Sequence, residues 1–162
     1  MANRFLAIHL NDHLAGSAAG VELARRLRTS NKGDPEMGPT LAQVCGEIEE
    51  DREVLEALMD RLGVRRDPLK PVLAWAGEKL GRLKPNGQLR GYSPLSRLVE
   101  LEGLTLGVTG QMQLWRGLER SLDSVEGFDF EQMAERAADH RERLEALRLQ
   151  AAARAFSDLP KG

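Results

Sequence analysis

Residues 39–63 read PTLAQVCGEIEEDREVLEALMDRLG, and this stretch decides the fold class. Its apolar side chains recur every three or four residues, as they do along one face of an α-helix. The members of this stripe are Leu41, Val44, Cys45, Ile48, Leu55, Leu58 and Leu62. Pro39 suits the first turn of a helix, and Gly63 suits the position just after its last turn. The stretch therefore predicts one amphipathic helix of about seven turns.

Two further segments show the same spacing of apolar residues and carry their own end signals. The helix expected over residues 3–29 is closed by the polar sequence SNKG at 30–33. The helix expected over residues 94–122 opens with Ser93 and Pro94, a capping residue followed by proline. Both segments are long enough to run the length of a small domain.

A fourth long helix is expected over residues 129–156. It opens with an aspartate and carries Gln132 three positions later, which is a variant of the capping box. Asp67-Pro68 repeats the cap-and-proline signal and predicts a shorter helix over residues 68–82. The sequence thus predicts an all-α four-helix bundle with a short extra helix in the connection between its second and third main helices.

Composition supports one globular domain over residues 1–162. Hydrophobic residues make up 41% of the chain and charged residues 30%, and the net charge is -2. A charge so close to zero gives no reason to expect nucleic acid as a partner, and no apolar run reaches the roughly 18 residues of a membrane helix. The single cysteine, Cys45, excludes an intramolecular disulfide and lies on the apolar stripe. We expect a cytoplasmic protein.

Polar residues that interrupt the apolar stripes are the candidates for a metal site. Burying an ionisable group costs several kcal/mol unless it is paired or binds something. The candidate ligands are His9, Asp12, His13, Asp51, Glu102 and His140. Imidazoles and carboxylates together suit iron, zinc or manganese. The alternative is that these groups bond to one another as a buried network.

Four long helices with a longer middle connection resemble the ferritin-like superfamily, whose bundles hold two metal ions between carboxylates and histidines of all four main helices. The resemblance implies an up-down-down-up helix order, although the sequence also allows a simple up-down order. That family carries a Glu-x-x-His pair on each of two helices. Here the positions three before His13 and His140 hold Leu10 and Ala137. We therefore expect a degenerate site for a divalent metal inside the bundle.

The same candidate ligands bear on the expected enzymatic activity and on the height of each ligand along the bundle axis. No catalytic motif occurs in the sequence, so any enzymatic activity would be that of a metal-dependent oxidoreductase, as the resemblance implies. His13 and Asp51 fall at one level of the bundle whichever order the helices take, at about ten and twelve residues from the same end. Neither order brings Glu102 and His140 to that level together.

Glycines recur inside the first and the third main helix, at positions 16, 20, 103, 107 and 110. Each costs roughly 1 kcal/mol relative to alanine in a helix interior. One interpretation is that they let these two helices pack closely. The other is that they leave space for a ligand or for a helix of a second copy in a homodimer.

The connection from Lys79 to Val99 holds five basic residues and no acidic one. Together with the amino end of the helix at Pro94, these charges are typical of a site for a small anion. The candidate anion-binding residues are Arg82, Lys84, Arg90, Tyr92, Ser93 and Arg97. A solvated loop that pairs with the acidic residues of 47–53 is the alternative. The second functional hypothesis is therefore an interaction or scaffold protein that forms a helical homodimer and binds an anionic group here.

Overall fold

Four α-helices make up the regular structure of residues 3–67 and 91–157, which are the residues that the computed structural model describes. The helices are α1 (Arg4–Asn31), α2 (Gly38–Arg61), α4 (Pro94–Ser121) and α5 (Phe130–Ala155). Within these two ranges there is no β-strand, which confirms the predicted all-α fold of four long helices. The short helix predicted over residues 68–82 lies outside the described residues.

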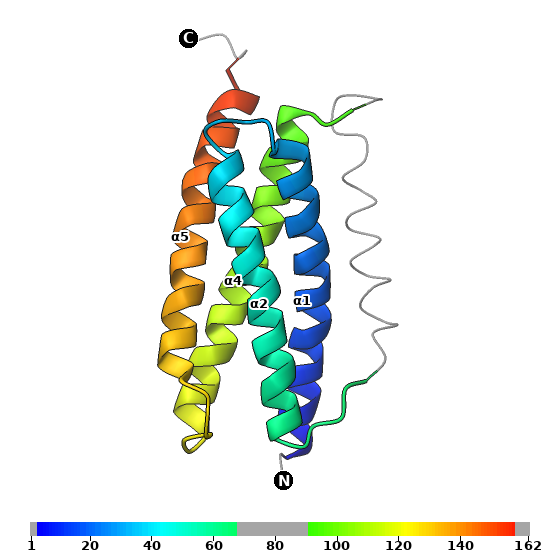
Figure 1. The fold of residues 1–162 in the computed structure, drawn as a ribbon, viewed down its shortest axis with the longest axis vertical. Helices are drawn as coiled ribbons and strands as arrows, with labels where there is room; N and C mark the ends of the chain where they lie inside the picture. Colours follow the sequence, from blue (N-terminus) through cyan, green and yellow to red (C-terminus); the bar gives the residue numbers. More distant parts are fainter. Residues whose placement is uncertain (1–2, 68–90, 158–162) are drawn as a thin grey trace.

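The helices run up, down, down and up in the order α1, α2, α4 and α5 (Figure 1). Because α2 and α4 run in the same direction, the chain between them starts at one end of the bundle and finishes at the other. At its start the Asp67 N–H donates to Asn11 Oδ1 of α1 at 2.8 Å. At its finish the Tyr92 hydroxyl accepts a hydrogen bond from Asn31 Nδ2, at the other end of α1 (3.0 Å).

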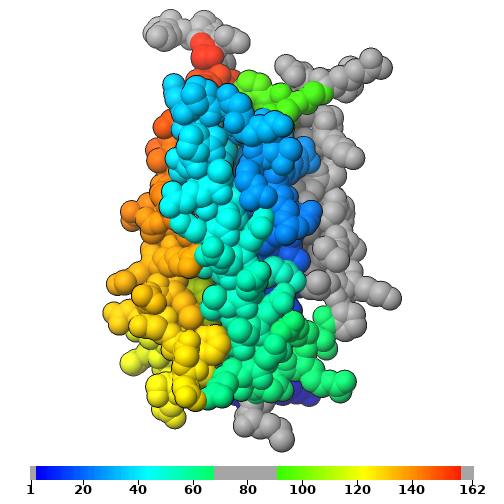
Figure 2. All heavy atoms as spheres, viewed as in Figure 1, coloured from blue at the N-terminus to red at the C-terminus, as the bar shows by residue number. Residues whose placement is uncertain are grey.

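Neighbouring helices in the bundle are antiparallel: α1 packs on α2 and on α4, and α5 packs on α4 and on α2. The space-filling view shows α2 covering one face of the molecule between α5 and α1 (Figure 2). Each helix therefore has two neighbours, and the bundle has four seams. Two of these seams, α2–α5 and α1–α4, contain the polar residues that matter below.

The helix ends carry the caps that the sequence predicts. Ser93 and Asp129 each accept a backbone N–H three residues later, both at 3.0 Å. Gly63 adopts a φ of 66°, a left-handed conformation that suits glycine at a helix C-terminus. The N–H of Val64 then reaches back to the carbonyl of Met59 at 2.9 Å. These local bonds satisfy backbone groups that the helices themselves leave unpaired.

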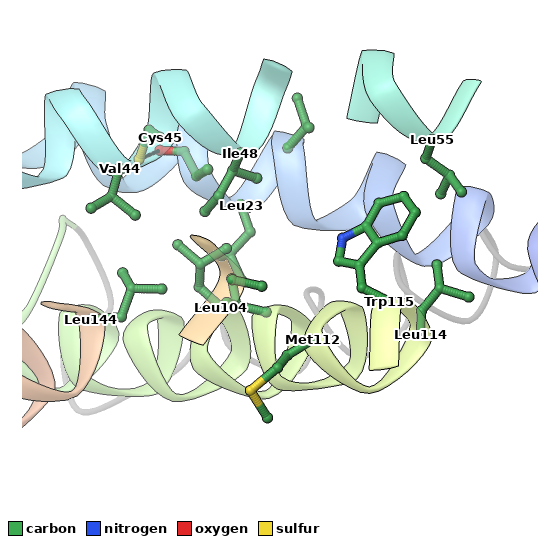
Figure 3. Packing of buried hydrophobic residues seen from close by; sticks show 14 of the residues in the cluster. Leu23, Val44, Cys45, Ile48, Leu55, Leu104, Met112, Leu114, Trp115 and Leu144 are labelled. Atoms are coloured by element: carbon green, nitrogen blue, oxygen red, sulfur yellow. Dashed lines mark hydrogen bonds between the residues drawn. The ribbon is translucent and has the colours of Figure 1, made fainter. Parts of the chain in front are cut away.

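One hydrophobic core fills the space between the four helices. Figure 3 shows Val44 and Ile48 of α2 directed toward α4, where Leu104 points back at them. Trp115 is 1% exposed and stacks on Phe130 of α5, with ring centres 6.3 Å apart. Cys45 belongs to this core: burial raises the pKa of its thiol to about 11, and Sγ lies 3.1 Å from a backbone carbonyl of α1.

Asp34, in the turn between α1 and α2, connects several elements at one end of the bundle. Its Oδ1 accepts the N–H groups of Glu36 and Met37, both at 3.0 Å. Its Oδ2 pairs with Arg154 of α5 at 2.7 Å and with Arg97 of α4 at 3.3 Å. The hydrogen bonds from Met37 and Arg154 lower the pKa of Asp34 to about 2, against the opposing effect of its burial.

We predict that Asp34→Ala lowers the free energy of unfolding by about 1–3 kcal/mol at pH 7, because it removes both the turn acceptor and the ion pairs. Asp34→Asn keeps an acceptor oxygen and should cost less. The folded pKa of about 2 lies below the unfolded value of 3.8, so the charge contribution is present above pH 4 and disappears as pH falls toward 2. Urea denaturation at pH 7 and pH 2.5 measures this. An equal difference between wild type and Asp34→Asn at both pH values would contradict it.

Candidate functional site

Asp51 and His140, two of the predicted metal ligands, lie against each other in the seam between α2 and α5. Nδ1 of the fully buried His140 is 3.3 Å from Asp51 Oδ2, and its Nε2 is 2.9 Å from Glu47 Oε2. Arg136 Nε lies 3.0 Å from Asp51 Oδ1, and Arg143 pairs with Glu47. The seam therefore contains two carboxylates, an imidazole and two guanidinium groups.

This network does not fit a metal ion. Both nitrogens of His140 lie within 3.3 Å of carboxylate oxygens, and those carboxylates already pair with Arg136 and Arg143. Two arginines already supply the positive charge that a metal would bring. Although burial acts to raise the pKa of Glu47, hydrogen bonds from Arg143 and Gln43 hold it below its usual value. Glu47 is thus stabilised as an anion by protein groups.

Glu102, predicted to point inward, is about half exposed and lies 3.7 Å from Arg148 of α5. Glu100 is the buried glutamate of α4: it is 2.6 Å from Arg26 of α1 and accepts a hydrogen bond from the Tyr92 hydroxyl at 2.9 Å. Residues two apart on a helix face nearly opposite directions, so only one of the two glutamates lies inward. The prediction chose the wrong one. Burial raises the pKa of Glu100.

The six predicted metal ligands are divided among three places. His9, Asp12 and His13 lie together on α1, Asp51 and His140 lie between α2 and α5, and Glu102 lies at the surface. Across residues 3–67 and 91–157, no group of three or more His, Cys, Asp or Glu side chains is arranged to hold a metal ion. Asp51 is directed toward α5 and His13 toward the α1–α4 seam, so a shared level does not bring them together.

Three of the predicted anion-binding residues lie outside the described residues, namely Arg82, Lys84 and Arg90. The other three have partners within the protein. Ser93 caps α4, the Tyr92 hydroxyl donates to Glu100, and Arg97 pairs with Asp34. Their polar groups therefore fix the start of α4 against α1 and the α1–α2 turn, and the predicted anion site stays a prediction.

A pocket of about 360 Å³ opens in the seam between α1 and α4 and reaches α2. Its apolar wall consists of Ile48, Leu55, Leu104, Val108 and Leu114. Three of the glycines noted in the sequence, Gly16, Gly20 and Gly107, also line it. The volume lies within the range of about 300–1,000 Å³ that is usual for small-molecule sites.

The glycines keep this pocket open. A Cβ atom added at Gly16, Gly20 or Gly107 would meet no described atom within 4 Å, and the same holds at Gly110. At Gly103 an added Cβ would lie 3.3 Å from Leu23 Cδ2 of α1. Close helix packing therefore explains Gly103 alone. Along the rest of the seam, the glycines leave space.

Two histidines form the polar end of the pocket. The rings of His9 and His13 lie 4.6 Å apart, edge to face at 79°. Burial and the charge of His9 lower the pKa of His13, and Asp12 opposes them only in part. The His13 ring is therefore neutral at pH 7, with one N–H donor and one acceptor nitrogen. Gln111 of α4 adds a side-chain amide to the same pocket.

The fold and this site define an all-α bundle protein with an apolar pocket and a polar, histidine-bearing end. No protein-family model, no curated protein and no solved structure matches the chain. No helix in the described part of the chain is long and apolar enough to cross a membrane.

We predict that His140→Ala lowers the free energy of unfolding by about 2–4 kcal/mol, because it removes a fully buried ring and leaves Asp51 beside an empty space. Asp139→Ala is the matched control: this neighbour is 61% exposed and, within the described part of the chain, pairs with Arg143 alone, so its loss should cost less than about 1 kcal/mol. Urea denaturation compares the two variants. If they lose equal stability, the network is not what holds α2 to α5.

We also predict that Gly107→Ala stabilises the protein by about 0.8–1.0 kcal/mol, since alanine favours the helix and its Cβ meets no described atom within 4 Å. The melting temperature should rise by about 2–4 °C. Gly38→Ala is the contrasting control, because there a Cβ would lie 3.0 Å from the carbonyl oxygen of Asn31. That variant should be less stable than wild type. A loss of stability in Gly107→Ala as well would mean that the seam is closed.

Proposed function

We propose that this chain is a ferritin-like bundle that binds a small, mainly apolar molecule in the pocket between α1 and α4. The up, down, down, up order of its helices, with one connection that returns along the bundle, supports the ferritin-like assignment. The observation that carries the binding function is the pocket itself, an apolar volume of about 360 Å³ whose glycine walls meet no neighbouring side chain of the described residues.

The lining defines the chemistry of the ligand. Five aliphatic side chains from α2 and α4 form one wall, which favours a hydrocarbon or aromatic body. His13 and Gln111 offer neutral donors and acceptors, which favour one hydrogen-bonding group on that body. Ser17 contributes little, because its hydroxyl already donates to the Leu14 carbonyl at 2.7 Å. A metal ion beside His140 has no part in the proposal, because the residues there do not fit one.

A homodimer is the second candidate, and it uses the same glycine faces. Leu106 lies beside Gly107 and is 74% exposed, so an apolar side chain of α4 is available to a second copy. In such a dimer a helix of the partner, not a small molecule, would cover the seam. Light scattering at increasing protein concentration distinguishes the two: a constant monomer mass supports the ligand pocket.

We predict that N-phenyl-1-naphthylamine, an uncharged aromatic fluorophore, binds the wild-type protein saturably with a rise in fluorescence. Gly107→Leu should weaken this binding at least tenfold, a change of about 1.4 kcal/mol, because the new side chain occupies the pocket. Gly117→Leu is the matched control, since Gly117 lies on the same helix, also meets no described atom within 4 Å and does not line the pocket. Equal binding by all three proteins, or no saturable binding by wild type, would overturn the proposal.

A further inference from the structure

His9 and His13 are two of the three histidines in the chain, and they lie one helical turn apart on the same side of α1. Both line the pocket described above. Two histidines four positions apart on a helix are a known spacing for two ligands of one zinc ion. The question is whether these two rings are free to act in that way.

Their separation fits a shared metal ion. A zinc ion about 2.0–2.1 Å from one nitrogen of each ring lies roughly 3.2 Å from each ring centre, so centres 4.6 Å apart correspond to an N–Zn–N angle of about 90°. The rings are now edge to face at 79°. Rotation of an imidazole about its Cβ–Cγ bond is soft, so both rings can turn a nitrogen toward a common point.

Neither ring has another task among the described residues. His140 is held between two carboxylates, whereas neither His9 nor His13 has a hydrogen bond or an ion pair to any part of the described chain. Asp12, between them in sequence, lines the same pocket and places a negative charge beside the pair.

We propose that His9 and His13 chelate one divalent transition-metal ion, with Zn²⁺ as the test case, at the polar end of the α1–α4 pocket. Imidazole pairs suit zinc, copper and nickel better than calcium or magnesium. Two protein ligands leave coordination positions open, as catalytic and ligand-binding zinc sites do. Water fills them, or a donor atom of the pocket ligand does. This last step rests on the proposed function, whereas metal chelation by the histidines does not.

Calorimetric titration of Zn²⁺ into protein without a polyhistidine tag tests the chelate by itself. Wild type should bind one Zn²⁺ with a Kd below about 100 μM. His9→Ala and His13→Ala should each weaken binding at least tenfold. Weaker binding by wild type than this limit, or equal binding by the three proteins, would overturn the proposal.

A relocated pair provides the matched control. Phe5 is 80% exposed on α1 and lies four positions before His9. In the double variant Phe5→His, His13→Ala, the histidines at positions 5 and 9 regain the chelating spacing one turn nearer the N-terminus. This variant should recover zinc binding, which shows that the loss in His13→Ala came from chelation and not from misfolding. Failure of the relocated pair to bind zinc would contradict the chelate geometry.

The open coordination positions are tested with 2-naphthohydroxamic acid, which has an aromatic body and a metal-binding head. Zn²⁺ should raise its affinity for wild type at least fivefold and leave N-phenyl-1-naphthylamine unaffected. In the relocated variant zinc should bind without this gain. If wild type binds zinc but binds neither of the two naphthalene probes, the proposed pocket function is wrong and metal chelation by the histidines is supported. If wild type binds both naphthalene probes but does not bind zinc, metal chelation by the histidines is wrong and the proposed pocket function is supported.

Discussion

The ion pairs around the buried Asp51 and His140 constrain the register of α2 against α5. Asp51 and Glu47 lie one turn apart on α2, and each faces a ring nitrogen of His140. Buried charges are tolerated only when they are paired, so sliding one helix by a turn would leave carboxylates without partners. This pairing turns one side of α2 toward α5. Ile48 and Leu55, on another side of the same helix, then face the α1–α4 seam and form the back of the pocket.

The seam between α1 and α4, on the opposite side of the bundle, is closed by contacts at one end and contains the pocket further along. Near the end where α4 begins, Arg26 of α1 pairs with the buried Glu100, and Leu23 approaches Gly103. Further along, a Cβ added at Gly20 or Gly107 would meet none of the described atoms within 4 Å. Glycine in a helix lowers stability relative to alanine, and at Gly20 and Gly107 no contact with the described residues offsets this loss. Natural proteins commonly give up stability in this way where a binding site needs it, which is why the pocket and not the charged seam carries the proposed function.

Most of the fold could be predicted from sequence, because its determinants are local. The apolar stripe of residues 39–63, the serine and aspartate caps, and Gly63 each act within a few residues. The partners of Asp51 were harder to predict from the sequence. Its spacing from Glu47, and that of His140 from Arg136 and Arg143, put complementary charges on one face of each helix. Only the three-dimensional order of the helices shows that these faces meet.

The candidate site was predictable only in part. Helical spacing shows which residues share one face of a helix, but it does not show which other helix packs against that face. His9, Asp12 and His13 were identified as a polar group, and they do lie together at one end of the pocket. Glu102 was assigned inward in place of Glu100, because both border the same stripe. For the glycines, the sequence favoured close packing of the two helices over open space. Deciding between them requires the distance from each missing Cβ to the facing helix, which no sequence contains.

Crystals of the protein pressurised with xenon test the central claim most directly, because xenon enters apolar space that side chains do not fill. We expect a xenon site in the α1–α4 seam, in contact with Ile48, Leu104 and Val108, and none in the charged α2–α5 seam. Helices α1 and α4 packed together through Gly20 and Gly107, or side chains of this chain filling the same volume, would contradict the account.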